Sequence, residues 1–174
     1  MPDVIYHVAS SLDGYIATAD GGMDWLAPFQ AAQEDYGFAS FLALTEAVLM
    51  GSRTYEQSAG FDEWPFKGKP CWVFSERHLQ ARQPEVSVTA RTPEALVEEL
   101  GDRGVGSAWL VGGGTLAGSF SEAGLITEYV VSLIPVILGG GVPLLGPGGV
   151  RHVLKLADTR PYPSGIVQLR YVRG

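Results

Sequence analysis

The stretch that decides the fold is "WLVGGGTLAGSF" (109–120), where an apolar run meets three glycines and then a small-residue segment of helical character. Bare backbone N–H groups at such a helix start favour an anion. Gly112, Gly114 and Ala117 also satisfy the G-x-G-x-x-G/A dinucleotide fingerprint. That fingerprint belongs in a first βαβ unit, with an acid about 20 residues later for the ribose. The matching stretch "YVVSLIPVIL" (129–138) has no acid, so the fingerprint alone is weak evidence for a dinucleotide fold.

The same unit, a short apolar run followed by a helical segment, recurs along the chain. β-branched and aromatic runs predict strands at 4–9, 47–50, 71–75, 86–88, 108–111, 128–138 and 166–172. Helices are predicted at roughly 29–45, just after Gly51, at 93–100 and at 115–123.

Local signals support this alternation of strands and helices. Thr92 before Pro93 is an N-cap followed by a first-turn proline, and Gly124 stands where a helix closes. Alternating elements indicate a mainly parallel sheet with helices on both faces. Only the loop-rich 139–165 precedes the last strand, so that strand is predicted to enter antiparallel, as a hairpin partner or an edge.

Composition limits the class of protein. With 174 residues, 46% of them hydrophobic, the chain can bury one sizeable core, which predicts a single domain over 1–174. The net charge of −7 and the lack of a basic run argue against a nucleic-acid partner. The lone Cys71 cannot form an intramolecular disulfide. The sequence has no Cys/His cluster of ligand spacing, so we expect no structural metal site.

Targeting signals are also missing from the sequence as given. The first residues carry no basic leader, and the longest apolar run is interrupted by Ser132 and Pro135. We therefore expect a cytoplasmic protein with no membrane-spanning segment.

Small and polar residues follow three of the predicted strands. "AVLM" runs into "GSRTYE", "CWVF" into "SERH" and "WLV" into "GGGTL". Ligands of open α/β sheets bind beyond the carboxyl ends of parallel strands, where these residues fall. Gly51, Arg53 and Thr54 combine a close backbone approach, a fixed cation and a hydroxyl, which suits a phosphate. The alternative interpretation is a plain strand-to-helix turn with a solvated arginine.

Four ordered motifs resemble one superfamily. They are "SLDGYIA" (11–17), "MGSRTYE" (50–56), "LVGGGTL" (110–116) and "PVILGGGVPLL" (135–145). In this order they resemble the dihydrofolate-reductase-like proteins, and most closely the RibD C-terminal reductase domain of riboflavin biosynthesis. The resemblance implies a three-layer α/β/α fold with a mostly parallel eight-stranded sheet, NADPH as hydride donor and commonly a homodimer. It also implies a cis peptide between Gly112 and Gly113.

Carried onto this sequence, the resemblance assigns the cofactor residues. It places the nicotinamide near Ala9 and Ile16, and the adenosine near Ser75. It places the phosphates against two sets of residues, namely Gly51, Arg53 and Thr54 in the first, and Val111, Gly112, Gly113, Gly114, Thr115 and Leu116 in the second.

Two departures from the family pattern bear on the cofactor. Ser52 stands where the related motif has its arginine, and Glu76 follows Ser75 where a small donor for the 2′-phosphate is usual. NADPH is therefore an expectation from the family, and NADH stays open.

A third departure bears on the substrate. Gln30 occupies the position of the folate reductases' pterin-binding acid, which disfavours folate reduction. On a continuous helix Asp35 would share a face with Phe38 and Leu42 and turn inward; the alternative is an ordinary first-turn acid. Asp13, Trp25, Gln30 and Asp35 are the weaker substrate candidates. No histidine is assigned a catalytic role.

Three functions stay open from sequence. The first is reduction of the riboflavin-pathway aminouracil ribosyl phosphate. The second is reduction of another heterocycle or carbonyl, and the third is a nucleotide- or flavin-binding module without turnover. The glycine-rich 138–149 is compatible with a substrate phosphate, a strap between strands or a dimer contact.

Overall fold

A central eight-stranded sheet organises the computed structural model, which describes residues 1–30, 33–147 and 149–174. Its strand order is β5-β4-β3-β6-β1-β7-β10-β9. These strands are β1 (Asp3–Ser11), β3 (Ala47–Gly51), β4 (Cys71–Phe74), β5 (Val86–Thr89), β6 (Ser107–Gly112), β7 (Glu128–Ile134), β9 (Leu154–Pro161) and β10 (Val167–Arg173). Two short strands, β2 (Tyr15–Ala17) and β8 (Val142–Pro143), pair separately.

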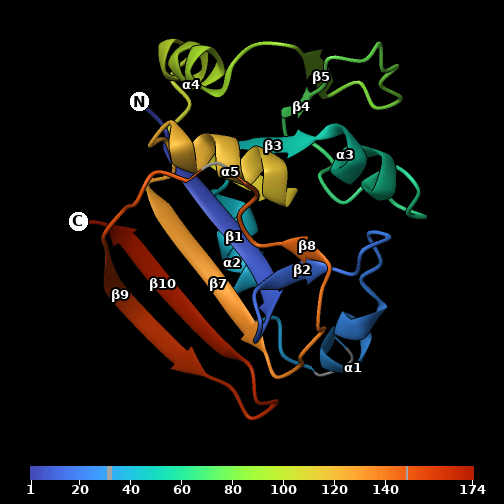
Figure 1. Cartoon of the computed structure of the whole chain (residues 1–174). Helices are drawn as coiled ribbons and strands as arrows, with labels where there is room; N and C mark the ends of the chain where they lie inside the picture. Colours follow the sequence, from blue (N-terminus) through green and yellow to red (C-terminus); the bar gives the residue numbers. More distant parts are fainter. Residues whose placement is uncertain (31–32, 148) are drawn as a thin grey trace.

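The strand directions confirm the mostly parallel sheet. All neighbours from β5 to β7 pair in parallel, whereas β10 runs antiparallel to both β7 and β9. The antiparallel C-terminal strand is therefore confirmed, but the alternative that it forms the edge is wrong. It is a hairpin partner of β9, and β9 is the edge of the sheet (Figure 1).

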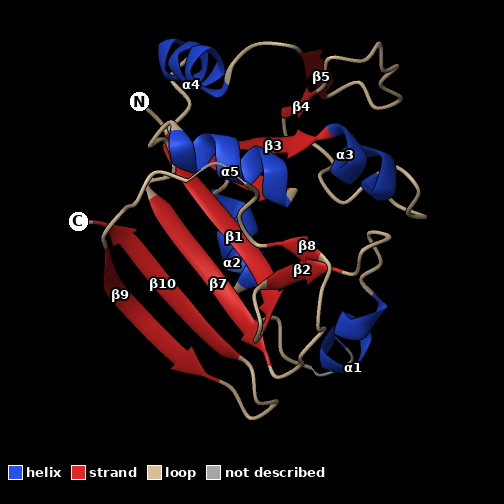
Figure 2. Ribbon diagram, in the orientation of Figure 1, coloured by secondary structure: helices blue, strands red, loops and turns tan. Residues whose placement is uncertain are grey.

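Helices cover both faces and give three layers (Figure 2). The helices are η1 (Asp24–Leu26), α1 (Ala27–Gln30), α2 (Phe38–Leu44), α3 (Ser52–Ser58), α4 (Pro93–Asp102) and α5 (Gly114–Glu122). Figure 1 shows α4 and α5 in front of the sheet and α2 behind it. In β3, Leu49 packs into the core under α4 and α5, and Met50 into the core under α2 and α3. Burial on both faces explains the unbroken apolar run of this strand.

Several local predictions are confirmed. The Thr92 hydroxyl accepts a hydrogen bond from the Ala95 N–H at 3.3 Å at the start of α4. Gly124 has a φ of 66° after α5, and the Gly112–Gly113 peptide is cis. Within the described residues no helix combines the length and apolar character that a membrane span needs.

Other boundaries differ from the sequence prediction. The helix predicted over 29–45 is two helices, because the chain turns at Tyr36 and Gly37, whose φ angles are 56° and 76°. The strand predicted over 128–138 ends at Ile134, directly before Pro135. Most of the other predicted strands and helices begin or end one or two residues away from their predicted bounds, and β2, β8 and β9 were not predicted.

Candidate active site

Two glycine turns face each other at the carboxyl ends of β3 and β6. Met50 pairs with Gly112, so both strands end side by side. A methyl group on Gly51 would lie 3.8 Å from the Gly112 carbonyl oxygen, and one on Gly113 would lie 3.8 Å from Thr54 Oγ1. The space between the turns is therefore lined by backbone and one hydroxyl, which is the surface that a phosphate can approach closely.

Each of the two helices that frame this space has an exposed residue in its first turn. Arg53 is exposed in the first turn of α3, and it makes no ion pair with the described residues. Thr115 is exposed in the first turn of α5, whose initial N–H groups have no partner within the helix. Val111 and Leu116 instead pack against the two sides of the core, where they hold the turn in place.

The adenosine side of the predicted site lies after β4. The Ser75 hydroxyl accepts from the Arg77 N–H at 3.1 Å, so it shapes a turn. The Arg77 guanidinium reaches back to α3, where it donates to Ser52 Oγ at 3.3 Å and pairs with Glu56 at 3.1 Å. The structure thus brings the segments after β3 and β4 together, as the predicted phosphate and adenosine residues require.

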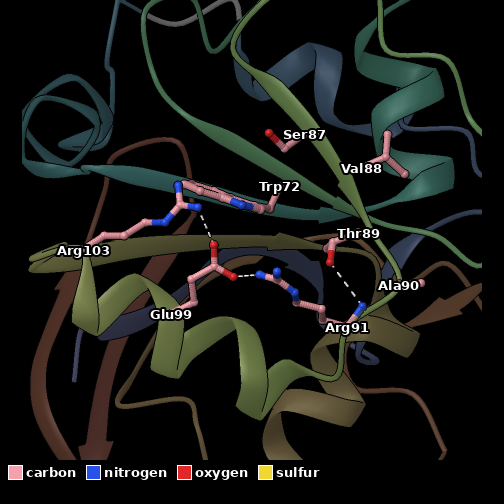
Figure 3. A pocket seen from close by; sticks show the side chains of 8 residues that line it. All are labelled: Trp72, Ser87, Val88, Thr89, Ala90, Arg91, Glu99 and Arg103. Carbon is pink, nitrogen blue, oxygen red and sulfur yellow. Dashed lines mark hydrogen bonds and ion pairs between the residues drawn. The ribbon is translucent and has the colours of Figure 1, made fainter.

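A cavity of about 570 Å³ adjoins this turn, between β5 and α4. The Ser75 N–H donates to the Thr89 carbonyl, and Thr89 lines the cavity. Figure 3 shows Glu99 of α4 bridging Arg91 and Arg103, with the Trp72 ring beside Arg103. Two guanidiniums share one carboxylate here, so the group keeps a net positive charge near the adenosine side.

The predicted nicotinamide residues lie at the end of β1. Ala9 is half-buried there, and Ile16 lies in β2, which folds over the end of the sheet. Asp13 holds the turn between β1 and β2. Its carboxylate accepts from the Ser11 hydroxyl at 2.6 Å and from the N–H groups of Leu138 and Gly139. These bonds, the Ser11 one foremost, lower the Asp13 pKa. The carboxylate is thereby committed to the protein itself.

The glycine-rich segment after β7 crosses from β2 to α5. The Leu144 N–H donates to the Gly14 carbonyl at 2.9 Å, and the Gly146 N–H donates to the Gly114 carbonyl at 2.8 Å. Residues 142–146 therefore form a strap between β2 and α5. Gly148, part of the same glycine-rich stretch, lies outside the described residues.

The remaining substrate candidates lie in different surroundings. Trp25 packs with Leu26 and Ala9 in a small cluster at the end of β1, where the nicotinamide is predicted to lie. Gln30 is exposed at the end of α1. The inward orientation of Asp35 is wrong: it is exposed and accepts from the N–H groups of Gly37 and Ala39, at 3.0 and 3.2 Å. It precedes α2 because the predicted helix is interrupted.

A pocket of about 300 Å³ lies under α2, next to the predicted position of the nicotinamide. Ala9 pairs with Ser132 of β7, whose hydroxyl accepts from Gln168 Nε2 at 3.1 Å, and Gln168 lines the pocket. The full lining is His7, Tyr36, Gly37, Ser40, Phe41, Val130, Asp158, Arg160, Gln168 and Arg170. Because Ser132 is the strand partner of Ala9, a substrate held here would lie next to the predicted position of the nicotinamide.

Charges in this pocket are largely paired. Arg170 donates to both oxygens of Glu128 at 2.7 and 2.8 Å, which raises the arginine pKa. Arg160 lies 3.4 Å from Asp158. The pocket therefore offers two cations, each next to a carboxylate.

His7 is the buried titratable group of the pocket. Its ring packs edge-on against Phe41, with centroids 4.4 Å apart, and its Nδ1 has no hydrogen-bond partner among the described residues. Burial lowers the His7 pKa to about 4, so the imidazole is neutral at pH 7. A neutral imidazole nitrogen can donate a hydrogen bond to a ligand ring, or accept one from it, without adding charge to the pocket.

Sequence reasoning missed this pocket because its residues come from five separate segments. The one signal was in β10, where "VQLRYVR" alternates apolar and polar residues and so places Gln168 and Arg170 on one face. Nothing local predicted that Tyr36 or His7 would meet them.

Comparisons with known proteins show the family of the chain. The RibD C-terminal domain model matches residues 63–168. The uncharacterised protein YwjB of Bacillus subtilis is 31% identical over 170 residues, covering 97% of each chain. The riboflavin biosynthesis protein RibD of Mycobacterium tuberculosis is 28% identical over 88% of this chain but only 48% of its own length.

A solved structure extends the likeness to three dimensions. A proposed riboflavin biosynthesis protein from Shewanella sp. PV-4 superposes with a TM-score of 0.89 at 28% identity, covering 100% of this chain and 99% of that one. The chain belongs to the RibD C-terminal domain family.

Proposed function

We propose that the protein is an NADPH-dependent reductase that transfers hydride from the nicotinamide to a C=N or C=O carbon of a small heterocyclic or carbonyl substrate. The observation that carries the proposal is the pair of facing glycine turns, one step along the sheet from the Ala9 end of β1. A dinucleotide could lie across these strand ends with its phosphates against backbone. The cofactor supplies the hydride, and the protein orients it and excludes water.

The substrate side fits a planar ring with a polar edge. In the proposal, Trp25 and the aromatic residues near His7 form walls, and the hydroxyl of Ser132 and the amide of Gln168 give hydrogen bonds. Arg160 and Arg170 are cations that a ribose phosphate could recruit, although each has a carboxylate nearby. This supports the aminouracil ribosyl phosphate of the riboflavin pathway as the first substrate to try. The exposed, uncharged Gln30 keeps folate the less suitable substrate.

The preference for NADPH over NADH is part of the proposal. The Arg91–Glu99–Arg103 group has two guanidiniums for one carboxylate, and Arg91 follows Thr89, whose carbonyl accepts from the Ser75 N–H. A 2′-phosphate carries the complementary charge. A reducing cytoplasm also suits the buried free thiol of Cys71.

The test is a fluorescence titration with NADPH and with NADH, followed by turnover assays. We expect Arg53→Ala to weaken NADPH binding about tenfold or more, because a charge-assisted hydrogen bond is lost. Arg151→Ala is the matched control, because Arg151 is also exposed but lies away from the glycine turns. Its neighbour His152 contacts Ser121 near the C-terminal end of α5, whereas the glycine turn is at the N-terminal end of that helix. Binding of neither nucleotide would refute the reductase. NADPH binding without hydride transfer to any carbonyl or imine substrate would favour the binding module instead.

A further inference from the structure

The side-chain amide of Gln168 is held in one orientation on the wall of the pocket under α2. Its Nε2 lies 3.1 Å from Ser132 Oγ and 3.3 Å from the Tyr36 carbonyl oxygen. A carbonyl oxygen can only accept a hydrogen bond, so the group that faces Tyr36 has to be the amide NH₂ and not the amide oxygen. Gln168 therefore uses both of its N–H groups on the protein itself.

The two groups that hold this amide are themselves fixed. Ser132 of β7 is the strand partner of Gln168 in β10, so the two side chains leave the sheet on the same side. Tyr36 belongs to the turn before α2, and its hydroxyl lies 3.1 Å from Ser164 Oγ. The Tyr36 ring packs edge-on against Tyr162, with centroids 4.8 Å apart. The turn is thereby tied to the connection between β9 and β10, which keeps the Tyr36 carbonyl beside Gln168.

The amide oxygen of Gln168 has no hydrogen-bond partner within the part of the chain that the structure describes. It is not enclosed by the protein either, and Gln168 lines the pocket. The oxygen and the nitrogen are the two arms of one planar group. An NH₂ turned toward Ser132 and Tyr36 therefore directs the oxygen away from them. The pocket meets a hydrogen-bond acceptor at this position.

A hydrogen-bond donor lies next to this acceptor. Arg170 is two residues further along β10, on the same side of the strand, and it also lines the pocket. Its guanidinium donates to Glu128 from Nε and Nη2, which leaves the N–H groups of Nη1 unused by that ion pair. The two side chains thus offer an acceptor and a donor side by side. Such a pair complements a ring edge on which an N–H and a C=O group are neighbours.

The rest of the wall suits a planar ring. Phe41 and Val130 are apolar and line the pocket together with the His7 ring. The volume of about 300 Å³ is at the lower end of the range of small-molecule sites, and it accommodates one heterocyclic ring with its substituents.

We propose that Gln168 is a specificity-determining residue of the reductase, and that its fixed amide oxygen selects substrates with a ring N–H, above all lactams whose C=O can reach Arg170. The inference rests on the proposed function, because it takes the pocket beside Ala9 as the substrate pocket. It narrows that function from heterocycles and carbonyl compounds in general to heterocycles that carry an N–H. Simple ketones, aldehydes and N-alkylated rings would leave the amide oxygen without a donor, and an unpaired polar group lowers affinity.

The experiment compares two isomeric probes, 4-methyl-2-pyridone and 1-methyl-2-pyridone. Both are lactams of the same size, but only the 4-methyl isomer retains its ring N–H. Their dissociation constants are measured on the full chain by ligand-observed NMR in excess NADP⁺, so that the nicotinamide side is not free for the probes. We expect the 4-methyl isomer to bind about fivefold tighter or more, because the 1-methyl isomer leaves a fixed acceptor unpaired.

Three variants separate a specific role of the amide from a structural one. Gln168→Met keeps the length of the side chain but removes the acceptor, so we expect the two isomers to bind equally. Ser132→Ala leaves the amide with the Tyr36 carbonyl as its one anchor, so the preference should shrink. Gln80→Met is the matched control, since Gln80 is exposed between β4 and β5 and does not line the pocket. The readout is the ratio of the two dissociation constants, because a general loss of structure lowers the affinity for both isomers alike.

Equal binding of the two isomers to the wild-type protein, or binding of neither, would overturn the inference. A preference that survives Gln168→Met would overturn it as well, as would one that Ser132→Ala leaves unchanged or that Gln80→Met abolishes. The NADPH titration on the same sample distinguishes this failure from a failure of the proposed function. NADPH binding without the preference leaves a reductase whose pocket does not select a ring N–H, whereas the absence of both removes the reductase too.

Discussion

Gly114→Ala should destabilise the protein through a clash with the strap. The α5 helix begins at Gly114, and a methyl group there would overlap the carbonyl oxygen of Pro143. That neighbour is backbone, held by the Gly146 N–H bond to the Gly114 carbonyl. Gly146 is itself tightly placed, since a methyl group added to it would lie 2.8 Å from Thr115 Cα. The strap therefore has to retreat as a unit, by roughly 1 Å.

The expected magnitude follows from overpacking and from the loss of a hydrogen bond. Forcing one methyl into a packed site costs about 1–3 kcal/mol, and a broken backbone hydrogen bond about 1 kcal/mol more. We expect Gly114→Ala to lower the free energy of unfolding by about 3 kcal/mol. For a chain of this size, that corresponds to a fall in Tm of roughly 6–12 °C.

Gly101→Ala is the control of opposite sign. Gly101 lies inside α4, where a methyl would meet Pro2 Cδ at an ordinary 3.5 Å. Alanine there should raise stability by about 0.5–1 kcal/mol, because the unfolded chain loses freedom. Thermal unfolding followed by circular dichroism measures both variants. A Tm of Gly114→Ala within about 2 °C of the wild type would refute the close packing of the strap on α5.

Three further predictions concern a cap, a buried base and a turn. Thr92→Ala should lower the unfolding free energy by about 1 kcal/mol in urea titrations, because the Ala95 N–H loses its acceptor. Since burial lowers the His7 pKa to about 4, from 6.5, the unfolded chain binds the extra proton between these values. The free energy of unfolding should therefore fall by up to about 3 kcal/mol from pH 7 to pH 4, and it should fall less in His7→Gln. An equal pH dependence of the unfolding free energy in the two proteins would contradict this. Asp13→Ala should speed amide hydrogen exchange at Leu138 and Gly139, since both N–H groups lose the carboxylate, and unchanged protection there would count against it.

The parallel part of the sheet was predictable because its strands are buried on both faces. Runs such as "AVLM" at 47–50 are apolar throughout, and a punctuating glycine follows at Gly51. The caps at Thr92 and Gly124 were predictable because their signals are local, acting within one helical turn.

The elements that sequence missed have weak or misleading local patterns. β9 reads "LKLADTRP", with mixed polarity, because most of its side chains are exposed on both faces. β2 and β8 are three and two residues long, too short for any periodicity. The break between α1 and α2 depends on the left-handed conformation of Tyr36, which a tyrosine seldom adopts and which sequence therefore does not predict.

The candidate site divides in the same way. Its predicted cofactor side consists of glycine turns at strand ends, which motifs and the strand-end rule indicate from sequence. Its pocket under α2 depends on long-range pairing, since His7 and Gln168 are far apart in sequence and meet only across β7. Position in the sheet, which no local pattern encodes, decides which polar residues face this pocket.

Strand β10 presents different side chains to the pocket and to the opposite face of the sheet. In β10, Gln168 and Arg170 face the pocket, and Val167, Leu169 and Tyr171 face the other way. β9, which adds Arg160 to the pocket wall, is paired within the sheet to β10 alone. The edge strand is therefore held from one side of the sheet only, so its guanidinium would be the less firmly placed group of the pocket.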